Sequence, residues 1–378
     1  MAQTEGYFDF NEYVVASEPQ RRERAEAWKV AIGLQQVDRL QTSEYLLDTA
    51  KRHIEGEITI DEARQLVKDY YESKFVREDG DDNKEEADRV SANIVKVLSQ
   101  PTFAFNTNGY ISVHRRIFEG VFKHAGKLRK YNITKKEWVL RGDTVNYLNW
   151  EDLRRALDYD IRQEVEFDHT KLSLDEFVKH ICQFVSGIWQ IHAFGEGNTR
   201  TTAVFTIQYL RSLGFNVDNE QFAAHSWYFR NALVRANYSN YQQKILRDTS
   251  FLELFFRNLL MGEQNELKNR HLVINPPEEW KITPTSTPIS TSASSGQDGL
   301  QTDNPLILNL VKVIGNNQCS IKEMLESVGL KDRNNFVEYH LMPAIKEGYV
   351  RLLHPETPRH PRQKYLLTVK GRLLYNTL

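Results

Sequence analysis

Apolar residues recur at intervals of three and four along most of the chain, which is the spacing of helices that bury one face. Between residues 21 and 71 the pattern stops at Gly56 and restarts at Thr59, where Thr59 and Glu62 make a capping box. The same spacing returns from residue 91 to residue 272. The pattern therefore predicts a mainly α fold.

One stretch inside the second helical region breaks this period. Residues 132–150 read NITKKEWVLRGDTVNYLNW, with aromatic and β-branched residues on both sides of Gly142-Asp143. Apolar arms around a Gly-Asp pair are typical of a short β-hairpin. We expect an α-rich domain that carries one small β-hairpin as a flap.

The C-terminal part of the chain has a different order of patterns. Residues 305–378 predict helices, the last of them ending at Gly348, followed by two strands around a proline-rich turn. Ser320 and Glu323 make a second capping box. This order is typical of an α+β winged helix-turn-helix.

Two changes of composition divide the chain. A charged run at 77–89 ends the first helical region, and a segment rich in Ser, Thr, Pro and Gly at 275–304 has no apolar period. We therefore predict an N-terminal helical segment over 1–90, an α-rich domain over 91–274, a linker over 275–304 and a winged helix over 305–378.

The composition places few limits on function but excludes some classes. With 49 Lys and Arg against 51 Asp and Glu in 378 residues, the net charge is −2, so the whole chain is no polyelectrolyte and any nucleic-acid contact must be local. Cys182 and Cys319 are far apart and fit a reducing compartment. The sequence shows no signal peptide and no long apolar run, so we expect a cytoplasmic protein with no membrane partner. No pattern indicates an oligomeric state.

The chemistry gathers in residues 188–205, IWQIHAFGEGNTRTTAVF. A helix that begins at the Ser173–Glu176 capping box keeps its apolar spacing to Ile191, so His192 lies at its end. The glycine-containing turn ends that helix, and Asn198 or Thr199 is expected to cap the next one.

A glycine-rich turn at a helix N-terminus favours an anion. Glu196 would repel a bare phosphate but suits a phosphate bound with Mg²⁺, because hard cations take carboxylate and phosphate oxygens together. Arg200 opposes the dipole of the helix that it begins, and phosphate oxygens would give it a partner. The alternative is an ordinary helix corner in which Glu196 pairs with Arg200.

These residues resemble the Fic (filamentation induced by cyclic AMP) motif HxFx(D/E)GNGRxxR. Six positions stand in register, namely His192, Phe194, Glu196, Gly197, Asn198 and Arg200. The upstream stretch 114–133 is similar to the helix and Ala-Gly-Lys-x-Arg turn of the family, and the hairpin around Gly142 lies where the family has its target-positioning flap. The resemblance implies an all-α Fic domain with one hairpin over 91–274.

The resemblance also implies the transfer of AMP from ATP to a Ser, Thr or Tyr hydroxyl. The hydroxyl would belong to a target protein or to the chain itself. His192 would be the general base, and Glu196 would hold Mg²⁺ at the α- and β-phosphates. Phe194 would fix the turn to the core. The nucleotide phosphates would be bound by Gly195, Gly197, Asn198, Thr199 and Arg200, with Arg200 on the β-phosphate.

The chain departs from the family motif at three positions. Ala193 replaces a proline, Thr199 replaces the second glycine, and Ala203 stands where many members carry a second arginine for the γ-phosphate. Many members are inhibited by a glutamate that pairs with this arginine. Residues 31–40 resemble that inhibitory region in position but offer Asp38. We therefore expect no carboxylate–arginine lock and a purely structural N-terminal segment.

Two other functions compete with adenylyl transfer. A Doc-like kinase would use the same scaffold for another phosphate transfer. Alternatively, the chain is a bacterial DNA-binding regulator whose Fic domain senses a nucleotide: residues 305–378 hold 11 Lys and Arg against 6 Asp and Glu, an excess of five positive charges. The presence of His192 favours an enzyme, because binding alone needs no general base.

Overall fold

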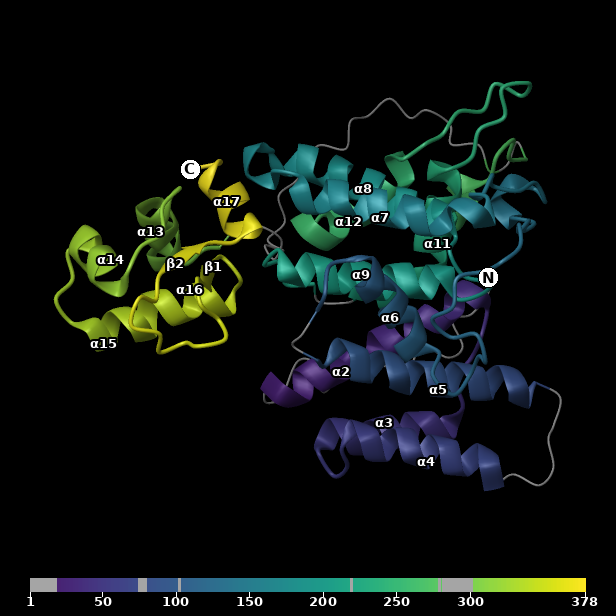
Figure 1. Ribbon diagram of the computed structural model, residues 1–378, viewed down its shortest axis with the longest axis horizontal. Coiled ribbons are helices and arrows are strands. Elements are labelled where there is room, and N and C mark those ends of the chain that lie inside the picture. Colours follow the sequence, from purple (N-terminus) through teal and green to yellow (C-terminus); the bar gives the residue numbers. More distant parts are fainter. Residues whose placement is uncertain (1–18, 74–79, 101–102, 218–219, 278–279, 281–301) are drawn as a thin grey trace.

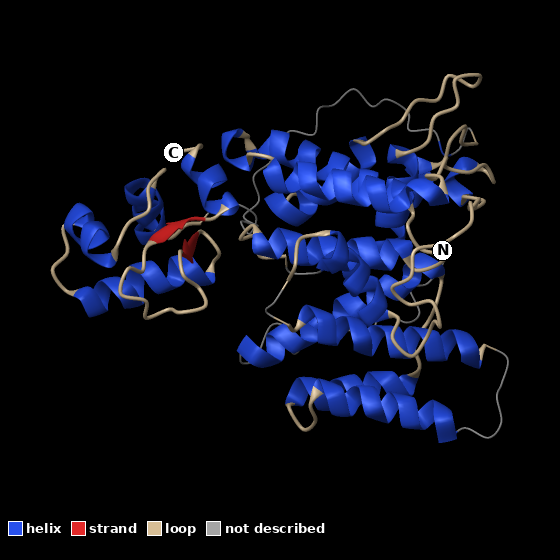
Figure 2. Cartoon of the chain, viewed as in Figure 1, coloured by secondary structure: helices blue, strands red, loops and turns tan. Residues whose placement is uncertain are grey.

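The computed structural model describes residues 19–73, 80–100, 103–217, 220–277, 280 and 302–378. Over these residues the protein is mostly helical, and its one sheet has two strands (Figure 2). The predicted fold class is confirmed. Within the described ranges, each helix is too short or too polar to cross a membrane.

The main helices before the C-terminal module are joined by turns and loops, the longest of which runs from Ile117 to Leu153. They are α2 (Pro19–Gly33), η1 (Leu34–Asp38), α3 (Glu44–Glu55), α4 (Ile60–Ser73), α5 (Asp81–Leu98), α6 (Thr107–Ile117), α7 (Leu153–Glu166), η4 (His169–Lys171), α8 (Leu174–Ile191), α9 (Asn198–Ser212), α10 (Glu220–Ala224), α11 (Ser226–Ala236), α12 (Ser250–Met261) and η5 (Asn269–Leu272). Figure 1 shows them stacked in layers, with α9 between α7–α8 and α2–α5.

Helix α9 forms the centre of the main core. Every residue from Asn198 to Leu210 is buried, polar ones included. Aromatic rings from neighbouring elements close around it: Phe105 stacks on Tyr209 at 4.1 Å and on Phe205 at 5.4 Å between ring centroids. Because α9 is surrounded, both of its ends are fixed by the core rather than by local propensity.

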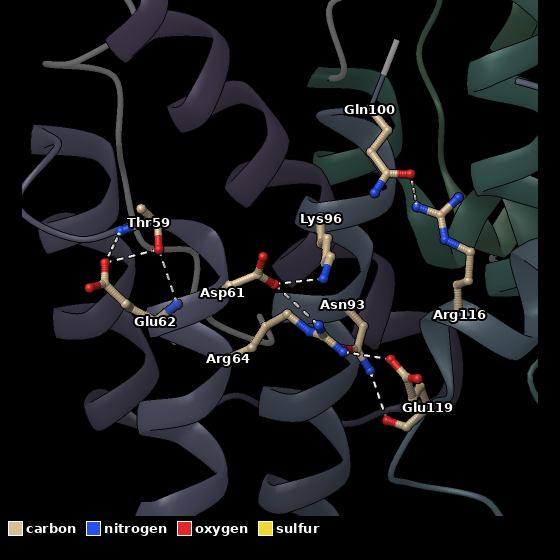
Figure 3. A network of polar contacts seen from close by, with 9 residues as sticks. All are labelled: Thr59, Asp61, Glu62, Arg64, Asn93, Lys96, Gln100, Arg116 and Glu119. Atoms are coloured by element: carbon tan, nitrogen blue, oxygen red, sulfur yellow. Dashed lines mark hydrogen bonds and ion pairs between the residues drawn. The ribbon is translucent and has the colours of Figure 1, made fainter. Parts of the chain in front are cut away.

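The N-terminal helices are attached to this core through α5. Helix α2 packs along α5 on one side and α4 packs along it on another. Figure 3 shows the polar network of the α4–α5 contact. In it, Arg64 donates to Asn93 at 2.7 Å and pairs with Glu119 at 2.7 Å, and Lys96 pairs with Asp61 at 2.6 Å. The expected capping box of Thr59 and Glu62 is present.

The predicted flap differs from its expected form. The turn is there, because the amides of Glu137 and Gly142 bond to Asp143 and Glu137 carbonyls at 2.9 and 3.0 Å. Its arms form no strand within the described residues, and a 3-10 turn, η2 (Trp138–Leu140), replaces one arm. The cause is tertiary: Val139 is buried, and its carbonyl accepts from Ile274 N at 2.9 Å instead of from an opposing arm.

The C-terminal module has the predicted helices followed by two strands, and a further helix that was not predicted follows the strands. The module consists of α13 (Pro305–Ile314), α14 (Ile321–Val328), α15 (Arg333–Phe336), η7 (Val337–Leu341), α16 (Met342–Lys346), β1 (Val350–Leu352), β2 (Tyr365–Leu367) and α17 (Val369–Tyr375). β1 and β2 are antiparallel, and the Ser320–Glu323 capping box is present.

The module packs on the helical core at the end of α9. Lys370 N donates to Leu213 O at 3.1 Å, and Asn376 Nδ2 donates to Thr170 O at 3.0 Å. Gly214 and Gly348 approach so closely that a Cβ on either would lie within 2.3 Å of the other's backbone. Most of the linker predicted over 275–304 lies outside the described residues.

Three buried histidines make stability sensitive to acid. Burial lowers the pKa of His53 to about 4, that of His114 to about 3 and that of His192 well below its usual value. Below pH 6.5 these three histidines therefore bind protons in the unfolded chain but not in the folded protein, so acid favours unfolding. Burial raises the pKa of Asp88 to about 6. Below that pH the folded protein binds one proton on this carboxyl that the unfolded chain does not, which offsets one of the three histidines.

We predict that the free energy of unfolding falls by about 3 kcal/mol per pH unit between about pH 6 and 4.5, the net effect of two protons. Urea titrations at several pH values measure this slope. His53→Gln should reduce the slope by about 1.4 kcal/mol per unit. A pH-independent stability in this window would contradict the argument.

Candidate functional site

His192 ends α8 with a left-handed backbone, φ 51°, and its amide bonds to Trp189 O at 3.0 Å. The side chain is buried under the ring of Tyr147, with 4.1 Å between ring centroids. Neither ring nitrogen has a hydrogen-bond partner among the described residues. Burial, and then the charge of Lys135, holds the pKa of His192 well below its usual value. The imidazole is therefore neutral and has a free acceptor nitrogen at neutral pH.

Arg129 fixes the end of α8 behind this histidine. Its Nε donates to His192 O at 2.8 Å and its amide donates to Ala193 O at 3.0 Å. Its guanidinium also reaches Tyr131 O at 2.6 Å and Leu148 O. The buried cation thus satisfies the carbonyls that a helix end leaves unpaired. Arg129 is the arginine of the Ala-Gly-Lys-x-Arg turn seen in the sequence, where it was assigned no role.

The turn after His192 is closed by Asn198. Phe194 N donates to Asn198 Oδ1 at 2.9 Å, and Asn198 Nδ2 donates back to Phe194 O at 2.7 Å. Phe194 itself is buried and stacks on His114 at 3.7 Å between ring centroids. The turn is therefore fixed to the core through its aromatic residue, as expected.

The expected side-chain cap of α9 by Asn198 or Thr199 is wrong. The N-cap is Gly197, without a side-chain cap, because Asn198 is used to close the turn. Thr199 is directed into the core, where its Oγ1 accepts from Trp189 Nε1 at 3.0 Å. The first amides of α9 thus keep the capacity to bind an anion, since the first turn of a helix has no internal acceptors for them.

The glycines of the turn are required by close neighbours. A Cβ on Gly195 would lie 2.6 Å from the hydroxyl of Tyr131. A Cβ on Gly197, whose φ is 71°, would lie 2.1 Å from the ring of Phe118. Both positions therefore need glycine, because each backbone lies against an aromatic side chain in the buried turn.

Glu196 is the one exposed residue between Ile191 and Arg200. Its carbonyl is held by His114 Nε2 at 3.1 Å, while His114 Nδ1 accepts from Gly126 N at 2.8 Å. Burial lowers the pKa of His114 to about 3, so this neutral ring is a fixed bridge between two turns. The Glu196 carboxylate is left at the surface beside the α9 amides, and an exposed carboxylate oxygen there fits a hard cation such as Mg²⁺.

Arg200 is almost completely buried, at 2% exposure, and is bound by the N-terminal helices. Its NH2 group contacts Asp38 Oδ2 at 2.8 Å and Glu86 Oε1 at 2.7 Å, and its NH1 group donates to Gln35 at 3.0 Å. The alternative, in which Arg200 pairs with Glu196, is wrong: the acids that bind Arg200 come from η1 and α5. Sequence analysis missed Gln35 and Glu86, which carry no local motif.

The expectation that Asp38 lacks a cationic partner is therefore wrong. The family comparison placed this carboxylate opposite position 203, where the chain has alanine. In the structure η1 lies against the first turn of α9, so Asp38 reaches Arg200, one helical turn before the fully buried Ala203. The N-terminal segment therefore does form a carboxylate–arginine contact with the motif, but through Arg200 and not through an arginine at position 203.

Lys135, from the flap, is a further cation at this site that sequence analysis did not select. Burial lowers its pKa, and it lies within electrostatic reach of Asp38, Glu137 and Glu196. It is also the charged group that depresses the pKa of His192 most. The structure thus gathers His192, the glycine turn, Glu196, Arg200 and Lys135 around one end of the α8–α9 pair.

Comparisons with known proteins find related families and structures. Residues 104–210 match the Fic/DOC family, and residues 305–368 match the C-terminal domain of Fic-like proteins (filamentation induced by cAMP). A curated relative from Sinorhizobium fredii, named "Probable protein adenylyltransferase y4lH", is 28% identical over 128 residues, which are 34% of this chain and 62% of the relative. The match thus spans less than two thirds of that protein.

Two solved structures are also similar. A Fic family protein from Desulfovibrio desulfuricans is 16% identical, with a TM-score of 0.39 over 96% of this chain and 91% of its own. The N-terminal Fic domain of a VirB-translocated Bep effector protein from Bartonella quintana is 18% identical, with a TM-score of 0.31 over 40% of this chain and 76% of its own.

The turn itself can be tested by two glycine substitutions. We predict that Gly197→Ala lowers the free energy of unfolding by about 2–4 kcal/mol, because it adds a left-handed strain and a contact with Phe118. Gly142→Ala is the matched control: its φ is 93°, but no atom lies within 4 Å of the added Cβ, so about 1–2 kcal/mol is expected. Denaturant titration measures both, and equal losses would contradict the close contact.

Proposed function

The chain carries a Fic/DOC domain followed by a Fic-like C-terminal domain, and we propose that it is a protein adenylyltransferase that transfers AMP from ATP to a protein hydroxyl. One observation carries the proposal. A neutral, unpartnered histidine ends α8, and four residues later an exposed carboxylate stands beside the uncapped amides of α9. This arrangement suits a general base next to a metal–phosphate site, and the name of the Sinorhizobium relative supports the same reaction.

In this reaction His192 accepts the proton of a Ser, Thr or Tyr hydroxyl. The hydroxyl oxygen attacks the α-phosphorus of ATP, the bond from this phosphorus to the bridging oxygen breaks, and pyrophosphate leaves. The depressed pKa of His192 keeps its ring in the acceptor form at neutral pH. Tyr147, which covers the ring, must move aside when the hydroxyl enters.

The turn binds the nucleotide by backbone and charge. The amides of Gly197, Asn198 and Thr199, at the uncapped N-terminus of α9, would bind the phosphates together with the backbone of Gly195. Glu196 would hold Mg²⁺, which supplies charge neutralisation at the α- and β-phosphates. Positioning and charge account for most of the catalysis expected from such a site.

Arg200 is the proposed ligand of the β-phosphate, but two carboxylates hold it in this structure. Nucleotide phosphates and the acids of the N-terminal segment therefore compete for one guanidinium. This competition would give the N-terminal segment an effect on ATP binding beyond its structural role.

We predict that His192→Ala abolishes adenylyl transfer and leaves the affinity for Mg²⁺-ATP within about threefold, because a base acts on the incoming hydroxyl. Glu196→Gln should instead weaken the binding of Mg²⁺-ATP, because it removes the proposed metal ligand. Calorimetry of nucleotide binding and transfer of label from α-³²P-ATP separate the two effects. If His192→Ala loses binding and transfer in parallel, His192 is not the base.

The labelled position of ATP distinguishes adenylyl transfer from kinase activity. We expect label from the α-phosphate to enter protein, and mass spectrometry of the purified protein to find AMP on one of its own Ser, Thr or Tyr residues if the target is the chain itself. Incorporation from the γ-phosphate alone would replace the proposal by a kinase reaction.

Neutralising the acids at Arg200 should strengthen nucleotide binding. For the double variant Asp38→Asn, Glu86→Gln we predict a gain of about three- to tenfold in Mg²⁺-ATP affinity, measured by calorimetry. Glu85→Gln is the control, since Glu85 lies on the same helix but pairs with Arg89 at 2.7 Å. Weaker binding in the double variant would show that the acids orient Arg200 for the nucleotide instead of competing with it.

A further inference from the structure

A second group of metal-binding side chains lies away from the catalytic turn. Glu164 lies in the last turn of α7, His169 begins η4 and His180 lies in the first half of α8, and their ligand atoms are all within 4.8 Å of one another. Twelve residues separate His180 from His192, which is about 18 Å along a helix. The group is therefore independent of the site that binds the nucleotide.

The donor atoms of this group converge. Glu164 Oε1 lies 2.9 Å from His169 Nε2, and Glu164 Oε2 lies 2.7 Å from His180 Nε2. Ligands on a tetrahedral zinc ion, with bonds of about 2.0–2.1 Å, are about 3.3 Å apart. Small side-chain shifts of a few tenths of an ångström would therefore open this cluster enough for one ion.

The surroundings hold the ligands in place. Glu164 and His169 have side-chain exposures of 3% and 8%, while His180, at 19%, forms the edge nearest to solvent. Phe167 stacks on His180 with 3.8 Å between ring centroids, which restricts the rotation of the imidazole. Tyr209 donates to Glu164 Oε1 at 2.5 Å, the kind of outer hydrogen bond that orients a carboxylate ligand.

The chemistry of the donors selects the metal. Two imidazole nitrogens and one carboxylate oxygen suit Zn²⁺, whereas Mg²⁺ and Ca²⁺ prefer oxygen ligands alone. The exposed carboxylate of Glu196 and this buried nitrogen-rich group therefore call for different ions. A dication would also balance the charge of the buried Glu164 carboxylate.

We propose that Glu164, His169 and His180 bind one structural Zn²⁺ ion, with a water in the fourth position. The ion would join the end of α7 and η4 to α8. The same short segment carries the contact with the C-terminal module, because Thr170 O in η4 accepts from Asn376 Nδ2 at 3.0 Å. Zinc would thus stabilise η4, the segment that contacts the C-terminal module just after α17.

The test uses the full-length protein, purified without a histidine tag, stripped with a chelator and titrated with ZnCl₂. We expect one zinc ion per chain by calorimetry, a rise of several degrees in Tm at saturating zinc, and with Co²⁺ the visible absorption of a tetrahedral site. These readouts do not depend on adenylyl transfer, so failure of the proposed function leaves them unchanged.

Variants assign the ligands. Glu164→Gln and His180→Ala should each lose stoichiometric zinc binding and the rise in Tm, whereas His271→Ala, a histidine outside the group, should keep both. If the stripped wild-type protein takes up no zinc at about 100 µM and its Tm does not change, the group is a hydrogen-bonded cluster and the proposal is wrong. Uptake that survives in both ligand variants would also overturn it.

Discussion

The short connection between α8 and α9 can exist only because its polar groups are satisfied inside the protein. Asn198 closes the turn on Phe194, Arg129 takes the carbonyls at the end of α8, and His114 holds the carbonyl of Glu196. A buried turn without these partners would leave several donors and acceptors unpaired, each at a cost of about 1–3 kcal/mol. With them, the amides of α9 and the Glu196 carboxylate remain for a ligand.

The same constraint explains why helices from distant parts of the sequence surround the turn. Arg200 is buried beside Phe118, and a buried cation needs acceptors, which η1 and α5 supply. The N-terminal segment is thus an electrostatic part of the site. An account of nucleotide binding in this protein has to include the acids of that segment.

The α8–α9 pair is held at both ends by polar groups. The catalytic turn lies at one end, and Glu164, His169, His180 and Tyr209 connect α7, η4, α8 and α9 at the other. The C-terminal module packs next to that second end, so the two domains are joined beside this hydrogen-bonded group. Helices α8 and α9 therefore run from the turn that carries His192 and Glu196 to the contact with the C-terminal module.

The sequence by itself determined the helices with strong periods and caps, the order of elements in the C-terminal module, and the turn with His192 and Glu196, because these follow from residues close together in the chain. It did not determine how distant groups pair. The strands of the flap were lost because Val139 bonds to Ile274, and Asp38 meets Arg200 because η1 packs one turn earlier on α9 than the family comparison implied. Gln35, Glu86 and Lys135 carry no local signal, and the turn pattern that contains Arg129 does not show its partners, since packing sets the partners of all four. Periodicity fixes which face of a helix is buried, but only the tertiary structure decides which charge lies opposite that face.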